Sequence, residues 1–151
     1  MKFLIQKVSS AQVYVDQKII GKINNGLCIF VGYSLTDTSD DIEYLVDKLL
    51  KMRIFPDESK KKYFEKSIQE IDGKILLISQ FTLYADNKKG RRPSFSLAAK
   101  ADNAKKLYQS TVNLLKSKNI SVETGRFQAM MEVKIVNVGP TTILIDSEKK
   151  N

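Results

Sequence analysis

The sequence predicts an α+β fold, with a mostly antiparallel sheet or open β-barrel flanked by two helices in a single domain. Three observations support this prediction. The chain has 151 residues, 42% of them hydrophobic and 28% charged, which suffices for one apolar core under a polar surface. Most apolar segments are short and rich in β-branched and aromatic residues, as strands are. Only two segments repeat with the period of an amphipathic helix.

The N-terminal part of the chain is predicted to form four strands. The first three are rich in β-branched and aromatic residues and span residues 3–8, 11–15 and 18–20. Asp16-Gln17 forms the turn before the third strand. The turn signal Asn24-Asn25-Gly26 precedes the fourth strand, residues 27–31, which is apolar at every position and is therefore expected to be covered on both faces.

The first helix is predicted around residues 42–50, because apolar residues recur there at i, i+3, i+4, i+7 and i+8. Residues 37–39 supply candidates for its N-cap. Asp40 and Asp41 suit the positive end of the helix dipole. These signals agree with one another and indicate where the helix begins.

The second half of the chain is predicted to contain a strand, a helix and two more strands. The strand runs from the apolar residues 75–78 through residue 83, and its far end is polar. The helix is marked by Leu107, Thr111, Leu114 and Leu115, with Asp102 or Asn103 as its N-cap. The last two strands, residues 132–136 and 142–145, are separated by Gly139-Pro140.

The domain is expected to span residues 1–147, and residues 148–151 are expected to form a frayed polar tail. Isolated apolar sheet edges favour association, so a dimer that pairs or covers them would be unsurprising. The N-terminal apolar stretch is too short for a signal peptide, and no run is long enough to cross a membrane. Together with a single cysteine, this predicts a reducing, cytoplasmic location.

The composition excludes several mechanisms. The chain has no histidine and one cysteine, so Ser-His-Asp and Cys-His nucleophiles, His-ligated zinc, Cys-x-x-Cys pairs and intrachain disulfides are ruled out. Cys28 lies in an apolar run and is expected to be a buried structural thiol. Carboxylates such as Asp86 are not accompanied by a ligand cluster, so we expect no metal and no other cofactor.

The charge points to an acidic partner. Lysine and arginine total 25 against 17 acidic residues, a net charge of +8. Such a basic chain is expected to bind nucleic acid in preference to anionic lipid. The residues 87–95 concentrate this charge in Lys88, Lys89, Arg91 and Arg92 around a glycine. This segment is either a phosphate-binding loop or a solvated charged loop.

Two further segments have more polar or special-backbone residues than a core requires. Ser79-Gln80-Phe81-Thr82 ends an apolar strand, where hydroxyl, amide and main-chain N–H groups can converge on a carbonyl. The alternative is a strand end that happens to be polar. Residues 137–142 contain Gly139-Pro140, which leaves backbone carbonyls outside a strand ladder, or else forms an ordinary turn.

Four motifs in one order resemble the D-aminoacyl-tRNA deacylase family: Ser79-Gln80-Phe81-Thr82-Leu83, Gly90-Arg91-Arg92-Pro93-Ser94-Phe95, Gly125-Arg126-Phe127 and Asn137-Val138-Gly139-Pro140-Thr141-Thr142. The opening segment, with Ala11, Val13 and Val15, is also similar to the family's first hairpin, so the resemblance runs from about residue 1 to residue 147. The chain departs from the family at Phe64-Glu65, in a rearranged lysine-rich loop, and at Val138, a position that is often polar.

The resemblance implies a homodimeric enzyme that hydrolyses D-aminoacyl-tRNA at a subunit interface. Gly139-Pro140, cis in the family, would reach into the partner's pocket. There its carbonyls would bind the α-ammonium group and leave no room for an L side chain. Glycine has no side chain to exclude, so glycyl-tRNA mischarged on alanine tRNA is an expected second substrate. Met131 and Phe127 match pocket positions, although both are equally explained as core residues.

The expected chemistry needs no histidine. An aminoacyl ester is already activated and has a ribose hydroxyl beside it, so positioning and oxyanion stabilisation can suffice. We expect main-chain N–H groups near Phe81 and Thr82 to stabilise the oxyanion, an effect worth about 2.7–4 kcal/mol per donor. Gln80 and Ser79 would shape the adenosine end. A nucleophilic Thr82 hydroxyl is the alternative.

The acceptor end of the tRNA is expected to contact Lys88, Lys89, Arg91 and Arg92, with no membrane or DNA partner. Two other functions compete with this reading. One is a basic RNA-binding protein that holds acceptor ends without catalysis. The other is a small-molecule ester or amide hydrolase that uses a Ser-Lys pair, which would act on model esters without RNA.

Overall fold

Six strands form a mixed sheet in which the two longest, β1 (Lys2–Val15) and β6 (Glu132–Asp146), pair antiparallel. This computed structural model describes residues 1–59, 61–88 and 90–149. The other strands are β2 (Lys18–Ile23), β3 (Gly26–Gly32), β4 (Lys74–Ser79) and β5 (Val122–Thr124). Along its other edge, β1 pairs with β3 through its first half and with β2 through its second. The strand order is β2-β1-β3-β4-β5, with β6 beside β1.

The sheet curls until its two end strands meet. A Cβ atom added at Gly21 of β2 would lie 2.7 Å from the carbonyl oxygen of Thr124 in β5, so glycine permits this close approach. Three of the strand pairings are antiparallel, whereas β3–β4 and β4–β5 are parallel. The prediction of a mostly antiparallel, open barrel-like sheet with two helices is therefore confirmed.

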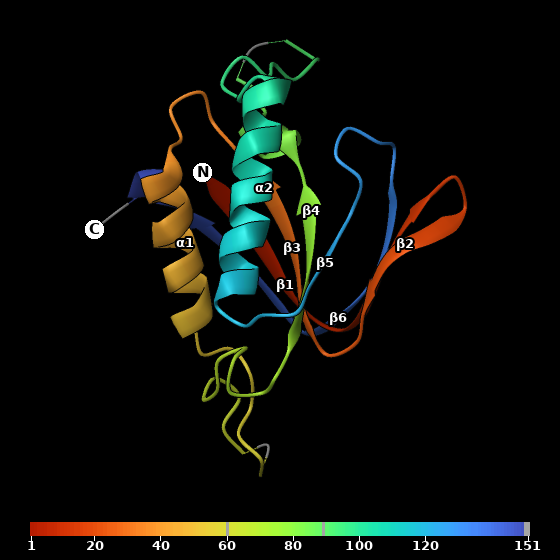
Figure 1. The fold of residues 1–151 in the computed structure, drawn as a ribbon, viewed down its shortest axis with the longest axis vertical. Helices are drawn as coiled ribbons and strands as arrows, with labels where there is room; N and C mark the ends of the chain where they lie inside the picture. The colour runs from red at the N-terminus through yellow and green to blue at the C-terminus, as the bar shows by residue number, and fades with distance from the viewer. Residues whose placement is uncertain (60, 89, 150–151) are drawn as a thin grey trace.

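Helices α1 (Ser39–Lys51) and α2 (Ala101–Ser117) lie side by side on one side of this sheet (Figure 1). The carboxylate of Asp41 accepts hydrogen bonds from the backbone N–H and hydroxyl of Thr38, the N-cap of α1, at 2.9 and 3.2 Å. Helix α1 buries the whole apolar face that its periodicity predicted. In α2, Thr111 and Leu115 are buried as expected, whereas Leu107 and Leu114 are half-buried. Among the described residues, neither helix is long and apolar enough to span a membrane.

Two apolar clusters form the core. One lies between the sheet and the helices and includes Phe3, Leu45 and Leu77, all fully buried. The other lies within the curl of the sheet and includes Val13, Cys28 and Leu76. Tyr108 of α2 donates a hydrogen bond to the carbonyl oxygen of Leu77 at 2.7 Å, which fixes the helix against β4.

Cys28 is expected to be chemically inert in the folded protein. Its side chain is buried, and burial raises the pKa of the thiol from 9.0 to about 12. Iodoacetamide at mildly alkaline pH should therefore label Cys28 only after unfolding in urea, as mass spectrometry would show. Folding raises the pKa of the Cys28 thiol, so the buried, protonated thiol contributes to the free energy of unfolding. This contribution is fully present below pH 9 and is lost as the pH rises toward 12. Rapid labelling of the native protein would contradict this expectation.

Several expected boundaries were wrong. The two N-terminal segments form the single strand β1, whose pairing with β6 shifts register on either side of Val8. The strand predicted to reach residue 83 ends at Ser79, and Phe81–Tyr84 form the 3-10 helix η1. The N-cap of helix α2 is Lys100, two residues before Asp102 and three before Asn103, the expected caps. The three-residue strand β5 was not expected at all.

Gly139 and Pro140 lie within β6 rather than between two strands. The register pairs Gln6 with Thr142 but Val8 with Asn137, so two steps along β1 are matched by five along β6. Residues 138–141 therefore bulge out of the ladder. Gly139 and Pro140 are exposed, and the peptide bond between them is cis.

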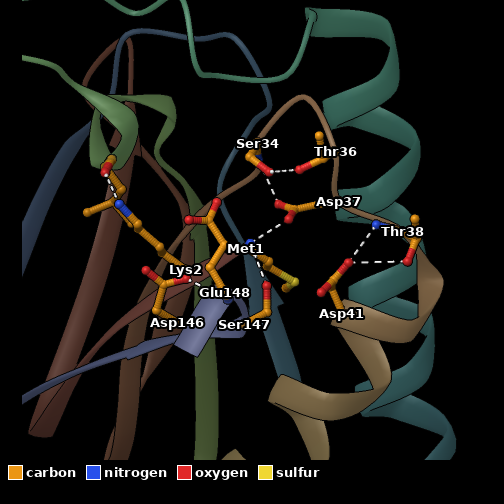
Figure 2. A network of polar contacts seen from close by, with 11 residues as sticks. Met1, Lys2, Ser34, Thr36, Asp37, Thr38, Asp41, Asp146, Ser147 and Glu148 are labelled. Atoms are coloured by element: carbon orange, nitrogen blue, oxygen red, sulfur yellow. Dashed lines mark hydrogen bonds and ion pairs between the residues drawn. The ribbon is translucent and has the colours of Figure 1, made fainter. Parts of the chain in front are cut away.

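A polar network joins the two ends of the chain (Figure 2). The α-ammonium group of Met1 donates hydrogen bonds to the Asp37 carboxylate at 2.5 Å and to the Ser147 hydroxyl at 2.7 Å. The second carboxylate oxygen of Asp37 accepts the backbone N–H of Ser34 at 2.7 Å. Ser147 begins the short 3-10 helix η2 (Ser147–Lys149), so the network fixes the last described segment to the start of β1. Of the tail expected over residues 148–151, residues 150 and 151 lie outside the described residues.

Candidate active site

A cavity of about 630 Å³ opens at the carboxyl ends of the parallel strands β3, β4 and β5. Crevices at this edge of parallel strands are common ligand sites, because the segments that follow the strands surround them. Here the segment after β3 contributes Tyr33 and the segment after β4 contributes Gln80. Residues 127–131, which follow β5, form a third wall.

The end of β4 supplies the polar side of the cavity through Ser79, Gln80 and Phe81. The backbone N–H of Gln80 donates to the carbonyl oxygen of Val31 at 2.7 Å, which extends the pairing of the two strands. The chain then turns into η1. Within the described part of the chain, the N–H groups of Phe81 and Thr82 have no main-chain acceptor, since a 3-10 helix leaves its first donors unpaired. Two consecutive N–H groups are thus free beside the cavity.

Aromatic rings frame two other sides. The Phe81 and Phe95 rings pack edge to face with centroids 4.9 Å apart. The Phe127 ring lies 5.9 Å from the Tyr108 ring, which ties the cavity wall to α2 and the core. A Cβ atom at Gly125 would lie 2.6 Å from the sulfur of Met131, so this glycine gives the methionine side chain its space against the cavity.

Small side chains leave the remaining space open. Four alanines, from the segment before α2 and from its first turn, line the cavity: Ala98, Ala99, Ala101 and Ala104. The segment between Asp86 and Ser94, which carries Lys88, Arg91 and Arg92, is the basic loop. Two backbone hydrogen bonds between Asp86 and Ser94, at 2.8 and 2.9 Å, close it. The carboxylate of Asp86 accepts the backbone N–H of Lys88 at 2.9 Å, so it holds the loop.

The cavity is poor in ionisable groups. Among the described residues that line it, only Tyr33 titrates. Burial raises the pKa of its phenol, and its hydroxyl group shares a hydrogen bond with that of Thr111 at 2.8 Å. Within the described ranges, no group of three or more Cys, Asp or Glu side chains is placed to hold a metal ion. The cavity therefore offers a ligand apolar surface, neutral amide and hydroxyl groups, and main-chain dipoles.

The structure brings together Ser79, Gln80, Phe81, Phe127 and Met131, five of the residues singled out in the sequence. The others lie elsewhere. Thr82 is exposed just beyond the cavity, where its hydroxyl accepts a hydrogen bond from the Gln80 amide at 2.5 Å. Gly139 and Pro140 do not line this cavity, and neither do the exposed Lys88, Arg91 and Arg92. Lys89 lies outside the described residues.

Sequence reasoning missed Tyr33, Gln128 and the alanine wall as site residues. The alanines stand close together between residues 98 and 104, and this clustering of small residues was the only signal available. Gln128 has φ of +61°, an uncommon conformation for a residue with a side chain, and this cannot be read from the sequence.

Residues 4–146 match the family model for D-Tyr-tRNA(Tyr) deacylase. The chain belongs to the D-aminoacyl-tRNA deacylase family. A D-aminoacyl-tRNA deacylase of Thermosipho africanus is 49% identical over 149 residues, covering 99% of both chains. One from Aquifex aeolicus is 51% identical over 149 residues, again covering 99% of both. The chain is therefore an enzyme, a hydrolase of the D-aminoacyl-tRNA deacylase type.

A solved structure named c-Myc DNA unwinding element binding protein has the same fold as this deacylase. It superposes with a TM-score of 0.91 and 38% identity, covering 97% of this chain and 98% of the other. The name states a DNA ligand for that protein. The likeness confirms the arrangement of the sheet and both helices.

Proposed function

We propose that this chain removes the amino acid from D-aminoacyl-tRNA and from glycine mischarged on alanine tRNA, and that it spares L-aminoacyl-tRNA. The observation that carries the proposal is a cavity at the end of β4 with two free main-chain N–H groups beside it. Such donors fit the developing oxyanion of an ester, and the cavity has the volume for an aminoacyl group with its nucleoside.

In the proposed reaction, water adds to the ester carbonyl carbon, and the bond between that carbon and the ribose oxygen breaks. The products are a free amino acid and a tRNA with its terminal hydroxyl restored. The N–H groups of Phe81 and Thr82 stabilise the oxyanion, while Ser79 and Gln80 orient the adenosine. The neighbouring ribose hydroxyl assists the proton transfers. Among the described lining residues, Tyr33 is the only one with an acid–base side chain. This supports a reaction in which the ribose hydroxyl, and not a protein side chain, assists the proton transfers.

The proposed selection against L residues uses a second copy of the chain. In a homodimer, the exposed bulge at Gly139 and Pro140 enters the partner's cavity, where its carbonyl groups accept the α-ammonium group of the substrate. Phe127 and Met131 pack beside the ligand. Two facts support this arrangement: the bulge is exposed, and within its own subunit it is not part of the cavity.

The acceptor end of the tRNA is proposed to lie against the loop that carries Lys88, Lys89, Arg91 and Arg92. The three of these that the structure describes are exposed, and the loop leads directly into Phe95 at the cavity wall. Lysine and arginine at such a position suit phosphate oxygens, so removing them should weaken tRNA binding without changing the preference for D over L residues.

Replacing Thr82 by alanine separates the two candidate roles of this residue. The backbone N–H persists in Thr82→Ala, and only the hydroxyl that accepts from Gln80 is lost. If the N–H is the working group, kcat should fall by less than about fivefold, the cost of one lost hydrogen bond. Loss of all turnover, together with an acyl-enzyme on Thr82 in the wild type, would instead make its side chain the nucleophile.

The proposed function is tested by the release of amino acid from D-tyrosyl-, L-tyrosyl- and glycyl-tRNA. We expect hydrolysis of the D and glycyl esters and survival of the L ester. Binding of tRNA without release from any ester would favour the RNA-binding alternative. Hydrolysis of simple esters without RNA would favour a small-molecule hydrolase, for which the described cavity residues offer no lysine to pair with Ser79.

A further inference from the structure

The exposed face of α2 carries an unbalanced positive charge. Lys105, Lys106 and Lys116 are all exposed, and among the described residues none of the three forms an ion pair. The helix has one acidic residue, Asp102. Between the lysines lie neutral amide side chains, with Gln109 donating to Asn113 at 2.9 Å. This face therefore offers cations and hydrogen-bonding groups with little competing negative charge.

The neighbouring helix shows that this pattern is not general. On α1, the ammonium group of Lys51 forms an ion pair with Asp47 at 2.8 Å, and that of Lys48 donates to the Tyr44 hydroxyl at 3.4 Å. The lysines of both helices are exposed, but those of α1 have contacts within their own helix, whereas Lys105, Lys106 and Lys116 of α2 form no ion pair among the described residues. Exposed lysines that form no ion pair within the described ranges therefore lie on α2, which follows the exposed cations Lys88, Arg91 and Arg92 in the sequence.

The position of α2 connects this face to the cavity. Ala101 and Ala104, in the first turn, line the cavity, and the helix runs away from it along the sheet (Figure 1). The opposite face is fixed in the core through Tyr108 and Thr111. A helix of 17 residues is about 25 Å long, so its charged face extends well beyond the cavity.

We propose that the exposed face of α2 binds the phosphate backbone of the duplex acceptor stem of the tRNA. This inference rests on the proposed function, because an aminoacyl ester in the cavity places the end of the RNA at the first turn of α2. The duplex that continues from a short single-stranded end then follows the helix. Lysine and amide side chains contact phosphate and sugar oxygens without reading sequence, so the surface accepts many tRNAs.

The test compares two double variants that each remove two positive charges. The first, Lys105→Ala with Lys106→Ala, strips the α2 face. The control, Lys48→Ala with Lys51→Ala, changes α1. Binding of uncharged tRNA and the KM for D-tyrosyl-tRNA are measured over a range of salt concentrations, and D-tyrosyl-adenosine serves as a substrate without a duplex.

We expect the α2 variant to bind tRNA several-fold more weakly at low salt, and its slope of log affinity against log salt to fall by about two, one for each phosphate contact. The control and all rates on D-tyrosyl-adenosine should be unchanged. Equal effects in the two variants, or a loss on D-tyrosyl-adenosine, would overturn the inference. So would weaker binding to a DNA duplex with unaltered binding to tRNA, which would assign the face to another nucleic acid.

Failure of the proposed function has a different signature. If the wild type hydrolyses neither substrate, the proposed function is wrong. The binding of uncharged tRNA still decides the role of α2 in that case, because it requires no catalysis.

Discussion

Replacing Gly139 by alanine is expected to reduce kcat/KM for D-tyrosyl-tRNA about a hundredfold, the cost of misplacing a contact by about 1 Å. Gly139 has φ of +117°, a conformation that residues with a side chain rarely adopt, and a Cβ atom there would lie 2.6 Å from the Thr141 hydroxyl oxygen. The bulge must therefore shift, while the exposed position keeps the protein folded. Steady-state kinetics and circular dichroism measure both effects.

The neighbouring variant Val138→Ala is the control. Its side chain is 40% exposed, and alanine leaves the backbone conformation unrestricted, so activity should stay close to that of the wild type. Full activity of Gly139→Ala would show that the bulge takes no part in the reaction.

For the proposed homodimer, a mixed dimer tests whether the bulge acts on the partner's cavity. One subunit carries Gly139→Ala, and the other carries Ala101→Trp, which places a large side chain at the cavity wall. If the bulge acts in the partner, one of the two sites in the purified heterodimer is intact, and about half of the wild-type activity returns. If the bulge acts within its own subunit, both sites stay damaged and no activity returns.

Replacing Gly26 by alanine is expected to be the most destabilising of these changes, by roughly 3 kcal/mol or more. Gly26 starts β3 and pairs with Lys74 of β4. A Cβ atom there would lie 1.9 Å from the carbonyl oxygen of Lys74, and because that atom is backbone, the two parallel strands must separate. Urea unfolding at a fixed protein concentration measures the loss.

Gly90→Ala is the matched control for stability. Gly90 also has positive φ, at +75°, but a Cβ atom there meets no atom within 4 Å. Its cost is therefore limited to backbone strain, about 1 kcal/mol. Equal losses for the two variants would mean that the contact with β4 is unimportant.

The sequence predicted the elements whose signal is local. Helix α1 was correctly placed because its apolar spacing, its acidic first turn and Thr38 at the N-cap all agree. The continuity of β1 was missed because the polar Ser9 and Ser10 interrupt its apolar alternation, at the point where its pairing with β6 shifts register. Strand β5 was missed because three residues carry too little pattern to distinguish a strand from a loop.

The site residues likewise fall into those that a local sequence signal predicted and those that it did not. Ser79, Gln80 and Phe81 were found because polar residues at the end of an apolar strand are visible in the sequence. Tyr33 and the alanines were not, since their place in the cavity depends on the parallel pairing of strands that are distant in the chain. The expected strand through residue 83 was wrong because the chain turns after Gln80, and this turn is what frees the two N–H groups.

The close approach of Gly21 to Thr124 has a consequence for motion. Strands β2 and β5 are the two ends of the strand order, so packing around a glycine, rather than a hydrogen-bonded ladder, closes the curl of the sheet. Separating β2 from β5 at this contact, the seam of the sheet, costs less free energy than separating two hydrogen-bonded strands. Because β5 leads directly into residues 127–131, opening of the seam moves one cavity wall while the end of β4 stays in place. We therefore expect the cavity wall formed by residues 127–131 to move more easily than the wall formed by the end of β4.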